Sequence, residues 1–399
     1  MRMIDHDTMI NHDTIINDDT TMESTSSGES ALRSGSLSVI MANFNHGKFI
    51  PRALRAFLTQ SLAAKEIIVI DDGSTDDSVR IIEAFARRYP SIRLICNPVN
   101  RGIVESIHSG LEAATGEFVL FAAADDFVLP GLFSRALAAL TEYPEAAFFC
   151  SGVALVDNAN RVIGLRPVTQ PSRRRSYLSP ADVRCEIAKT DFWFIGTSAV
   201  FRRRFVVETG YLDARLGSIG DVISSRALAF RHGFYFDPEV LAAYNKDPAS
   251  FSGRSALSVA NSRKLLAAAD AWIAENLPED VRGEQRRLFV RRMAFGFARL
   301  WVVWRSGTID TDAIAEILDF GPIDRKILAA LGRIPLASAV LTLGWMTLRQ
   351  RPFGILALAE AWRRALYFHW SGKAKVQREV DKIADCPSCG TPSAAVSSG

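Results

Sequence analysis

The feature that most constrains this chain is an alternation of short apolar runs with helical patterns, which begins at Leu37. Between the runs, apolar residues recur every three or four positions, as they do on one face of a helix. Strands that are apolar throughout and alternate with helices form a mostly parallel sheet covered by helices on both faces. We therefore expect an α/β fold. The predicted strands are Leu37–Met41, Glu66–Ile70, Ile92–Cys96 and Phe118–Ala122.

Each predicted strand is followed by a polar cluster. In an open α/β sheet, ligands bind outside the carboxyl ends of the strands. A single such cluster is explained by a turn, because Asn, Asp and Gly favour turns. Four clusters at one edge of a sheet instead favour a binding site. The candidates are Asn43 and Asn45, then Asp71 and Asp72, then Asn100 and Arg101, and finally Asp125 and Asp126.

The residue types at this edge restrict the ligand. The glycine-rich phosphate loops of dinucleotide-binding and P-loop proteins are missing from the sequence. Acidic residues outnumber basic ones at the edge, and carboxylates accept hydrogen bonds from a nucleotide base and ribose. They bind a diphosphate only through a divalent cation, because like charges repel. The sequence therefore predicts a metal-bridged nucleotide.

Four segments occur here in a specific order: Ser38–Asn45, Glu66–Asp76, Asn100–Gly102 and Gly116–Asp126, the last followed by Leu129 and Pro130. In these segments the run from Leu37 to about Gly253 resembles a family 2 glycosyltransferase with the GT-A fold, a Rossmann-like sheet.

The resemblance implies a nucleotide-sugar donor. It assigns the base and ribose to Asp71 and Asp72, and a Mn²⁺ or Mg²⁺ ion on the diphosphate to Asp125. Ala123 departs from the family's Asp-x-Asp motif, because it replaces the first Asp. Asn43, Asn45, Asn100, Arg101 and Asp126 are the further residues predicted to bind the donor.

A later stretch, from Phe192 to Asp213, resembles the acceptor side of the family, and its candidates are Trp193, Gly196 and Thr197. Trp193 would stack on a sugar ring or belong to the core. Asp221 matches the segment that carries the family's catalytic carboxylate, although Gly220 replaces the Glu that usually precedes it. We expect Asp221 to be the general base of an inverting transfer. The competing interpretation of Asp221 is a helix N-cap.

The predicted activity is transfer of a sugar from a nucleotide-sugar donor to a hydroxyl of a glycan or lipid-linked acceptor, for example in a cell-surface polysaccharide. Ala123 and Gly220 leave open a non-catalytic protein that binds nucleotide sugars or glycans. A sugar nucleotidyltransferase is disfavoured, because that class needs a basic, glycine-rich pyrophosphate loop after the first strand. The segment Asn43–Gly47 is not such a loop.

Charge divides the 399 residues into parts, although the net charge is only +3. Residues 1–36 carry two basic against seven acidic side chains and a threefold hexad repeat, which predicts a disordered tail. The glycosyltransferase domain is predicted over 37–255, a basic helical region over 256–385, and a flexible tail over 386–399. Cys386 and Cys389 in that tail supply only two of the four ligands of a structural zinc site.

The basic helical region allows two interpretations. Residues 285–305 contain six Arg and no acid, with one apolar face formed by Phe289, Met293, Phe297, Leu300, Trp301 and Trp304. That helix would pack on the catalytic domain, or it would join the apolar segment 334–348 in a surface over 285–375 that binds anionic lipid. No nucleic-acid recognition motif accompanies the charge. With no apolar run of spanning length, no secretory signal and few cysteines, we expect a cytoplasmic protein. The lipid-binding interpretation would add a peripheral position on the inner face of the membrane.

Overall fold

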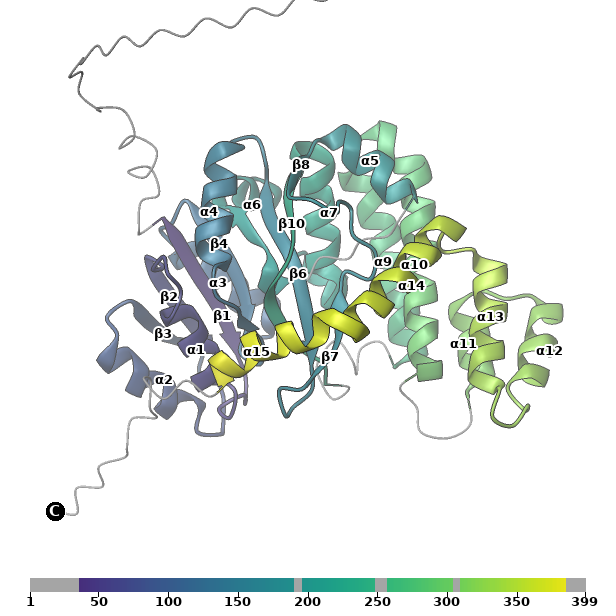
Figure 1. Ribbon diagram of the computed structural model, residues 1–399, viewed down its shortest axis with the longest axis horizontal. Helices are drawn as coiled ribbons and strands as arrows, with labels where there is room; N and C mark the ends of the chain where they lie inside the picture. Colours follow the sequence, from purple (N-terminus) through teal and green to yellow (C-terminus); the bar gives the residue numbers. More distant parts are fainter. Residues whose placement is uncertain (1–35, 190–195, 248–256, 304–308, 385–399) are drawn as a thin grey trace, which may run out of the picture. The chain divides into compact units, whose positions relative to one another are not determined.

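The computed structural model of the protein describes residues 36–189, 196–247, 257–303 and 309–384. Within these ranges one sheet follows the order β3-β2-β1-β4-β9-β6-β10-β5, with β7 beside β6 and β8 beside β10 (Figure 1). The strands are β1 (Leu37–Asn43), β2 (Glu66–Asp71), β3 (Ile92–Cys96), β4 (Phe118–Ala123), β5 (Phe127–Val128), β6 (Phe148–Val156), β7 (Val162–Arg166), β8 (Ser176–Leu178), β9 (Val200–Arg202) and β10 (Phe234–Asn245).

The sheet is mostly parallel along its main path, which confirms the predicted fold class. β1 pairs in parallel with β2 and β4, β2 with β3, and β6 with β10. β9 lies between β4 and β6 and is antiparallel to both. β1 continues two residues beyond the predicted strand, so that Asn43 lies in the strand and pairs in register with Asp71.

Alternate residues of the parallel strands enter two different cores. In β1, Val39 and Met41 pack with α1, α2 and α4, whereas Ile40 packs with the core that contains α3, α5, α6 and α7. Both faces of the sheet are therefore covered, which is why its strands are apolar throughout. These helices are α1 (Ile50–Leu58), α2 (Ser78–Arg88), α3 (Ile103–Ala113), α4 (Leu132–Glu142), α5 (Pro180–Lys189), α6 (Arg203–Thr209) and α7 (Gly220–His232).

The chain beyond β10 is helical, as predicted. Helices α9 to α13 extend the core that contains α3 and α7, and α15 returns to the opposite core, where Val376, Val380 and Ile383 are buried. Figure 1 shows α15 crossing beside α1 and β7. The helices are α9 (Val259–Asn276), α10 (Glu279–Val303), α11 (Thr311–Ile317), α12 (Pro322–Leu331), α13 (Ser338–Gln350), α14 (Ile355–Tyr367), the π-helical turn η4 (Phe368–Gly372) and α15 (Lys373–Ala384).

Helix α10 contains the six-arginine segment, and its apolar face lies inside the fold. Phe289, Met293, Phe297 and Trp301 are all buried in the core shared with α7 and α9. Arg292 is also buried, and it donates to the main-chain carbonyl of Ile187 at the end of α5. Of the two interpretations of this segment, packing against the rest of the domain therefore holds, and the apolar face of α10 does not face lipid.

Several predicted features fall outside the described ranges. These are the tails (apart from Ser36), with Cys386 and Cys389, the boundary between residues 255 and 256, and Trp304. Among the helices of the described ranges, none combines the length and the apolarity needed to cross a bilayer.

Candidate functional site

The carboxyl ends of β1 and β2 hold the first pair of candidate residues together. The side-chain amide of Asn43 donates to Oδ1 of Asp71 at 2.7 Å, and the main-chain N–H of Ser74 donates to Oδ2 of Asp71 at 2.9 Å. Both Asn43 and Asp71 are buried. Oδ1 of Asn43 is a buried acceptor that receives no hydrogen bond within the described ranges. The pair therefore presents a fixed carboxylate next to an acceptor that still lacks a donor.

Asn45 ties together the loops that follow β1 and β2. Its main-chain N–H donates to Oγ of Ser74 at 2.9 Å, and its side-chain Oδ1 accepts from the N–H of Thr75 at 2.8 Å. Asn45 has φ +55°, a left-handed conformation that Asn tolerates better than most residues. Asn45 thus has a structural role that joins the two loops at the sheet edge, and its contact with the donor stays a prediction.

Asp72 holds the loop that follows β3. Its carboxylate accepts from the side-chain amide of Asn97 at 2.8 Å, and from the main-chain N–H groups of Arg101 and Gly102 at 2.9 and 2.8 Å. Asp72 is buried, whereas Asn100 and Arg101 are exposed in that loop. The side chain of Asp72 therefore fixes the segment that presents Asn100 and Arg101.

Gly73 permits this close approach, and the sequence analysis did not identify its role. It has φ +75°, and a Cβ atom placed there would lie 2.9 Å from the main-chain nitrogen of Asn100. Only glycine fits a position that combines a left-handed conformation with such a contact. The Asp-Asp-Gly signal was visible in the sequence, but the partner loop was not.

The second half of the site lies at the end of β4. Asp126 is buried and bridges three segments, because it accepts from the hydroxyl of Thr197 at 2.6 Å and from the main-chain N–H of Asn245 at 2.9 Å. Both of its oxygens are thus engaged by protein. Asp125, its neighbour, is only partly buried, so that its carboxylate is the one available to a ligand.

Arg52 of α1 is a functional candidate that the sequence analysis missed. Its guanidinium donates to the main-chain carbonyl of Asp125 and to Oδ1 of Asn160, and it lies 4.4 Å from the ring centroid of Phe127. It thereby brings a positive charge to the segment that carries both carboxylates. No sequence pattern indicates this, since Asp125 and Asn160 are far from Arg52 in the chain.

Burial controls the electrostatics of this half. It raises the pKa of Asp125, while the charge of His46 opposes the shift. Burial and the adjacent charge of Asp125 raise the pKa of Asp126. Two neighbouring carboxyl groups with raised pKa values form a site that a cation stabilises.

A divalent cation fits this arrangement in one way. No cluster of three His, Cys, Asp or Glu side chains suited to a metal ion occurs in the ranges that the structure describes. Mg²⁺ is often held by only one or two carboxylates together with substrate phosphates. Asp125 supplies one such carboxylate, so that the donor set suits a metal ion completed by the diphosphate of a nucleotide rather than a preformed cage.

Asp221 lies in the first turn of α7, one position inside the helix. Helix α7 is capped by Ile219 without a side-chain hydrogen bond, and Oδ1 of Asp221 accepts from the N–H of Val222 at 2.8 Å. Asp221 is therefore not the N-cap residue of the competing interpretation. Burial raises its pKa from the ordinary value of 3.8 to about 6.

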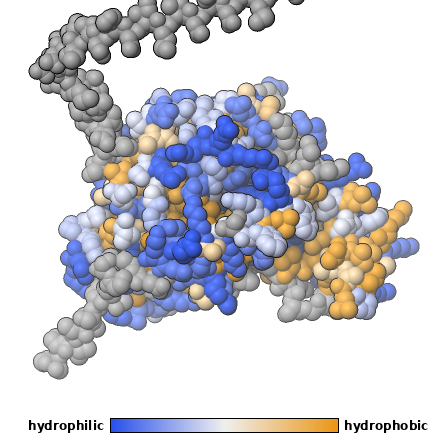
Figure 2. Space-filling model, viewed as in Figure 1, coloured by the Kyte–Doolittle hydropathy of each residue, from blue (hydrophilic) through white to orange (hydrophobic). Residues whose placement is uncertain are grey.

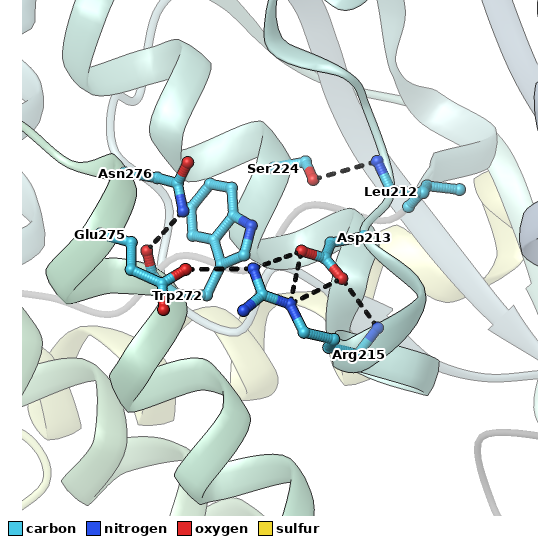
Figure 3. Close-up of polar contacts among 7 residues, drawn as sticks. All are labelled: Leu212, Asp213, Arg215, Ser224, Trp272, Glu275 and Asn276. Carbon is cyan, nitrogen blue, oxygen red and sulfur yellow. Dashed lines mark hydrogen bonds and ion pairs between the residues drawn. The ribbon is translucent and has the colours of Figure 1, made fainter.

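The segment before Asp221 is held to the C-terminal helices (Figure 3). Asp213 caps the 3₁₀ helix η3 (Ala214–Ile219) by accepting from the N–H of Arg215, and it also binds the guanidinium of Arg215 at 2.8 Å. Arg215 reaches Glu275 of α9 at 3.1 Å. Two parts of the chain that lie far apart in the sequence thus fix the start of α7.

The predicted acceptor-side residues are placed in part. Gly196 and Thr197 belong to the 3₁₀ helix η2 (Gly196–Ser198), which contacts β4, and Thr197 is buried with its hydroxyl on Asp126. Trp193 lies outside the described residues.

Sequence comparison decides the family. Residues 38–209 match the family described as Glycosyl transferase family 2. These residues are a family 2 glycosyltransferase domain. The match contains every predicted donor-side residue, from Asn43 to Asp126, and it ends before Asp221.

Relatives of this glycosyltransferase domain align over limited lengths. The uncharacterized glycosyltransferase YibD of Escherichia coli is 40% identical over 100 residues, 25% of this chain and 29% of that protein. EpsJ of Bacillus subtilis, also an uncharacterized glycosyltransferase, is 32% identical over 144 residues, 36% of this chain and 37% of its own. The cholesterol galactosyltransferase of Borreliella burgdorferi is 36% identical over 114 residues, 28% of this chain and 32% of its own. The chain thus spans about a third of the length of these relatives.

A solved structure shares the fold. Residues 1–349 of Staphylococcus aureus TarS, in complex with UDP-GlcNAc, superimpose with a TM-score of 0.55 at 15% identity, covering 79% of this chain and 92% of that one. The arrangement of the glycosyltransferase domain is therefore the GT-A fold, as the sequence resemblance implied.

Proposed function

We propose that this protein is an inverting glycosyltransferase that moves a sugar from a nucleotide-sugar donor to a hydroxyl of a glycan or lipid-linked acceptor. The observation that carries the proposal is that Asp71 and Asp72 at the end of β2, and Asp125 just beyond β4, lie at the carboxyl ends of the two strands that flank β1 within a family 2 domain. Open α/β sheets bind their ligands at that edge.

The donor's nucleoside is assigned to the ends of β1, β2 and β3. Asp71 would accept hydrogen bonds from the base or ribose, and Oδ1 of Asn43 would gain the donor that it lacks. Asn45 and Asp72 hold the surrounding loops, and the latter presents Asn100 and Arg101. The preference for carboxylates and amides over basic residues suits base and ribose rather than bare phosphate.

The diphosphate is assigned to the end of β4. Asp125 would hold a Mn²⁺ or Mg²⁺ ion there, since its carboxylate is not engaged as that of Asp126 is. When bound, such an ion neutralises negative charge on a leaving nucleoside diphosphate. Asp126 keeps the Asp125 segment against η2 and β10 rather than meeting the ion.

Asp221 is assigned the general base. With a pKa of about 6 it is mostly ionised at neutral pH, and it is a stronger base than an ordinary Asp. The Asp221 carboxylate takes the proton of the acceptor hydroxyl as its oxygen attacks the anomeric carbon. The bond from that carbon to the diphosphate oxygen breaks on the opposite face, and the configuration inverts.

Donor binding tests the first part of this assignment. A panel of UDP-, GDP- and dTDP-sugars, titrated calorimetrically with Mn²⁺ present, should give one preferred nucleotide. Asp71→Asn should weaken that nucleotide about tenfold or more, the effect of one lost charged hydrogen bond. Asp77→Asn, an exposed residue two positions beyond the loop's Thr75, is the matched control and should change nothing. Equal affinity in all three proteins would remove Asp71 from the donor site.

One observation keeps a second candidate open. Ala123 leaves one acidic side chain fewer at the end of β4 than the family's Asp-x-Asp motif provides. A protein that binds nucleotide sugars or glycans without turnover would tolerate this loss. Release of nucleoside diphosphate separates the two candidates, because only the enzyme produces it.

A peripheral position on a membrane is supported by a surface other than α10. Exposed apolar side chains gather on α12, α13 and their connection (Figure 2). Leu336 in the connection is fully exposed, and residues 325–359 contain five basic side chains without one acid. The apolar set is Ile323, Ile334, Leu336, Val340, Leu341 and Leu348, which we call the α12–α13 surface.

The charge of this surface favours anionic lipid as its partner. Asp324, which precedes the acid-free stretch, is already paired with Arg349 at 2.8 Å. A second copy of the chain would bring like charges together, whereas anionic headgroups would neutralise Arg325, Lys326 and Arg333. Exposed Trp362, Tyr367 and Trp370 on α14 and η4 are residue types that favour the lipid–water interface.

Vesicle flotation tests this proposal. The full chain should float with phosphatidylcholine vesicles that contain phosphatidylglycerol, and the bound fraction should fall severalfold with Leu336→Asp. Val207→Asp is the matched control, because Val207 is a half-exposed apolar residue on α6. Absence of flotation would contradict the proposal, and so would a wild-type dimer that Leu336→Asp converts to a monomer.

A further inference from the structure

Gln377 on the C-terminal helix α15 is hydrogen-bonded to the turn between β6 and β7. Oε1 of Gln377 accepts from the N–H of Val162 at 2.8 Å, and Nε2 donates to the main-chain carbonyl of Asn160 at 3.0 Å. The same Nε2 donates to Asp381 on α15 at 2.8 Å. Both hydrogens and the oxygen of this amide are therefore used, so that the side chain has one defined orientation.

The turn between β6 and β7 is also held by hydrogen bonds of its own. Asp157 closes it by accepting from the N–H groups of Ala159 and Arg161, each at 2.9 Å. Asn160 has φ +61° at its tip. A displacement of α15 is thus passed to Asn160 rather than absorbed within the turn.

Asn160 connects this turn to the candidate site. Its side-chain Oδ1 accepts from Arg52, whose other terminal nitrogen donates to the carbonyl of Asp125 at 2.5 Å. The guanidinium also lies over the ring of Phe127, two residues after Asp125. The contacts form one continuous chain: Gln377, Asn160, Arg52, Asp125.

The docking of α15 is strong enough to carry such a role. Val376, Val380 and Ile383 are buried in the same core as Ile50, Leu54 and Phe57 of α1, and α15 contacts both α1 and β7. Burial of these apolar side chains stabilises the contact of α15 with the domain. Helix α15 lies far beyond residue 209, where the family match ends.

We propose that Gln377 and Arg52 are positioning residues, through which α15 fixes the main chain at Asp125 and so the direction of its carboxylate. The helix then completes the diphosphate side of the site, although it belongs to no part of the matched domain. The catalytic consequence rests on the proposed function, because misplacing a ligating group by about 1 Å can cost a hundredfold in rate. The positioning itself does not depend on that function.

Hydrogen exchange measured by mass spectrometry on the full chain tests the positioning directly. In Gln377→Met, peptides that cover residues 121–130 should exchange about tenfold faster or more, whereas those that cover 66–76 should not change. Lys382→Met on the same helix is the control, because Lys382 is exposed and pairs only with Glu379 among the described residues. Unchanged exchange over 121–130 in Gln377→Met would overturn the proposal.

A second variant tests whether the effect arises from the Arg52 contact or from undocking of α15. Arg52→Lys keeps the positive charge but cannot bond Asn160 and Asp125 at the same time, as the guanidinium does. Exchange over residues 121–130 should therefore become faster, while α15 keeps its protection from exchange. The double variant Gln377→Met/Arg52→Lys should speed exchange over residues 121–130 no more than Arg52→Lys alone, since both residues act through the same series of contacts. Additive effects would show two independent structural losses and contradict the proposal.

Turnover and nucleotide binding separate this inference from the proposed function. Gln377→Met should lower kcat about tenfold with the KM of the acceptor unchanged, and it should weaken the binding of Mn²⁺ in the presence of nucleoside diphosphate. Loosened exchange without turnover in any form of the protein would support the positioning and reject the enzyme. Turnover and Mn²⁺ binding equal to wild type in both variants would reject the positioning role.

Discussion

Tyr211 stacks on Phe121 with ring centroids 4.6 Å apart and planes only 12° from parallel. Phe121 lies in β4, four residues before Asp125, and the main-chain carbonyl of Tyr211 contacts Nε2 of His108 at 2.7 Å. The Tyr211 hydroxyl bonds to Ser225 in α7, and the tyrosine lies close enough to Asp221 to feel its charge. This stack therefore sets where α7, with Asp221, begins relative to the end of β4.

Removing the ring should separate the two halves of the site. Tyr211 is buried, so Tyr211→Ala should lower the free energy of unfolding by roughly 3–5 kcal/mol and reduce kcat as well. Tyr211→Phe keeps the stack and loses one hydrogen bond, which costs about 0.5–1.5 kcal/mol. Urea unfolding of the two variants checks this, and equal losses would mean that the hydroxyl rather than the stack supports the position.

The raised pKa of Asp221 predicts the pH dependence of turnover. A general base acts in its ionised form, so kcat should rise with pH through about 6 and level off above it. The measurement is initial rate at saturating substrate across about pH 5 to 8. A rate that is flat through this range would argue that another group takes the proton.

The same shift predicts an unusual stability effect. Because burial raises the folded pKa of Asp221 above its unfolded value, ionising the group opposes folding at every pH above the unfolded pKa. Asp221→Asn should then lower turnover by about a hundredfold while the melting temperature at neutral pH stays level or rises. A helix cap would behave in the opposite way, since losing one costs about 0.5–2 kcal/mol.

Asp72 should matter for the loop rather than for a single contact with the donor. Asp72→Asn replaces an acceptor with an N–H group that faces the donors of Asn97, Arg101 or Gly102, so we expect a loss of about 1–3 kcal/mol in the free energy of unfolding. Chemical denaturation of wild type and Asp72→Asn measures this change in the free energy of unfolding. An unchanged stability would show that the three hydrogen bonds are dispensable.

Two glycines at opposite ends of α7 provide a matched pair. At Gly220 a Cβ atom would lie 3.4 Å from Leu212 and the φ angle is −62°, so Gly220→Ala should stabilise the fold by about 0.4–1 kcal/mol. At Gly233 the φ is +70° and the Cβ would lie 2.3 Å from the carbonyl oxygen of Leu178, so Gly233→Ala should destabilise it clearly. Thermal unfolding separates them, and two shifts of the same sign would contradict the geometry around α7.

The sheet and its polar edge could be predicted because their signals are local. Ile40 and Val39 are both buried, on opposite faces, and such doubly buried strands are visible as apolar runs. Asp71 ends β2 and Asp125 lies two residues beyond β4, so the parallel pairing of both strands with β1 brings them to the same edge of the sheet. The sequence could not predict that Asp126 bonds to protein while the carboxylate of Asp125 stays available, because this depends on Thr197 and Asn245 in later elements.

Long-range contacts account for what the sequence left undecided. Arg52 and Gln377 are ordinary residues on amphipathic helices, and the contacts that link them to Asp125 and to Asn160 span 73 and 217 positions. The six-arginine helix α10 was predicted with the correct apolar face, as the burial of Phe289 and Met293 shows. Periodicity alone does not tell whether such a face meets protein or lipid, because both are apolar.

The most direct test of the central claim is release of nucleoside diphosphate from the preferred nucleotide sugar, with crude glycan acceptor, in Mn²⁺ and in EDTA. Wild type would be compared with Asp125→Asn, Asp221→Asn and the control Asp77→Asn. We predict release that requires Mn²⁺, that falls by a hundredfold or so in the first two variants, as when catalytic groups are lost, and that is unchanged in the control. Tight donor binding without release in wild type, or release that survives in Asp221→Asn, would contradict the account.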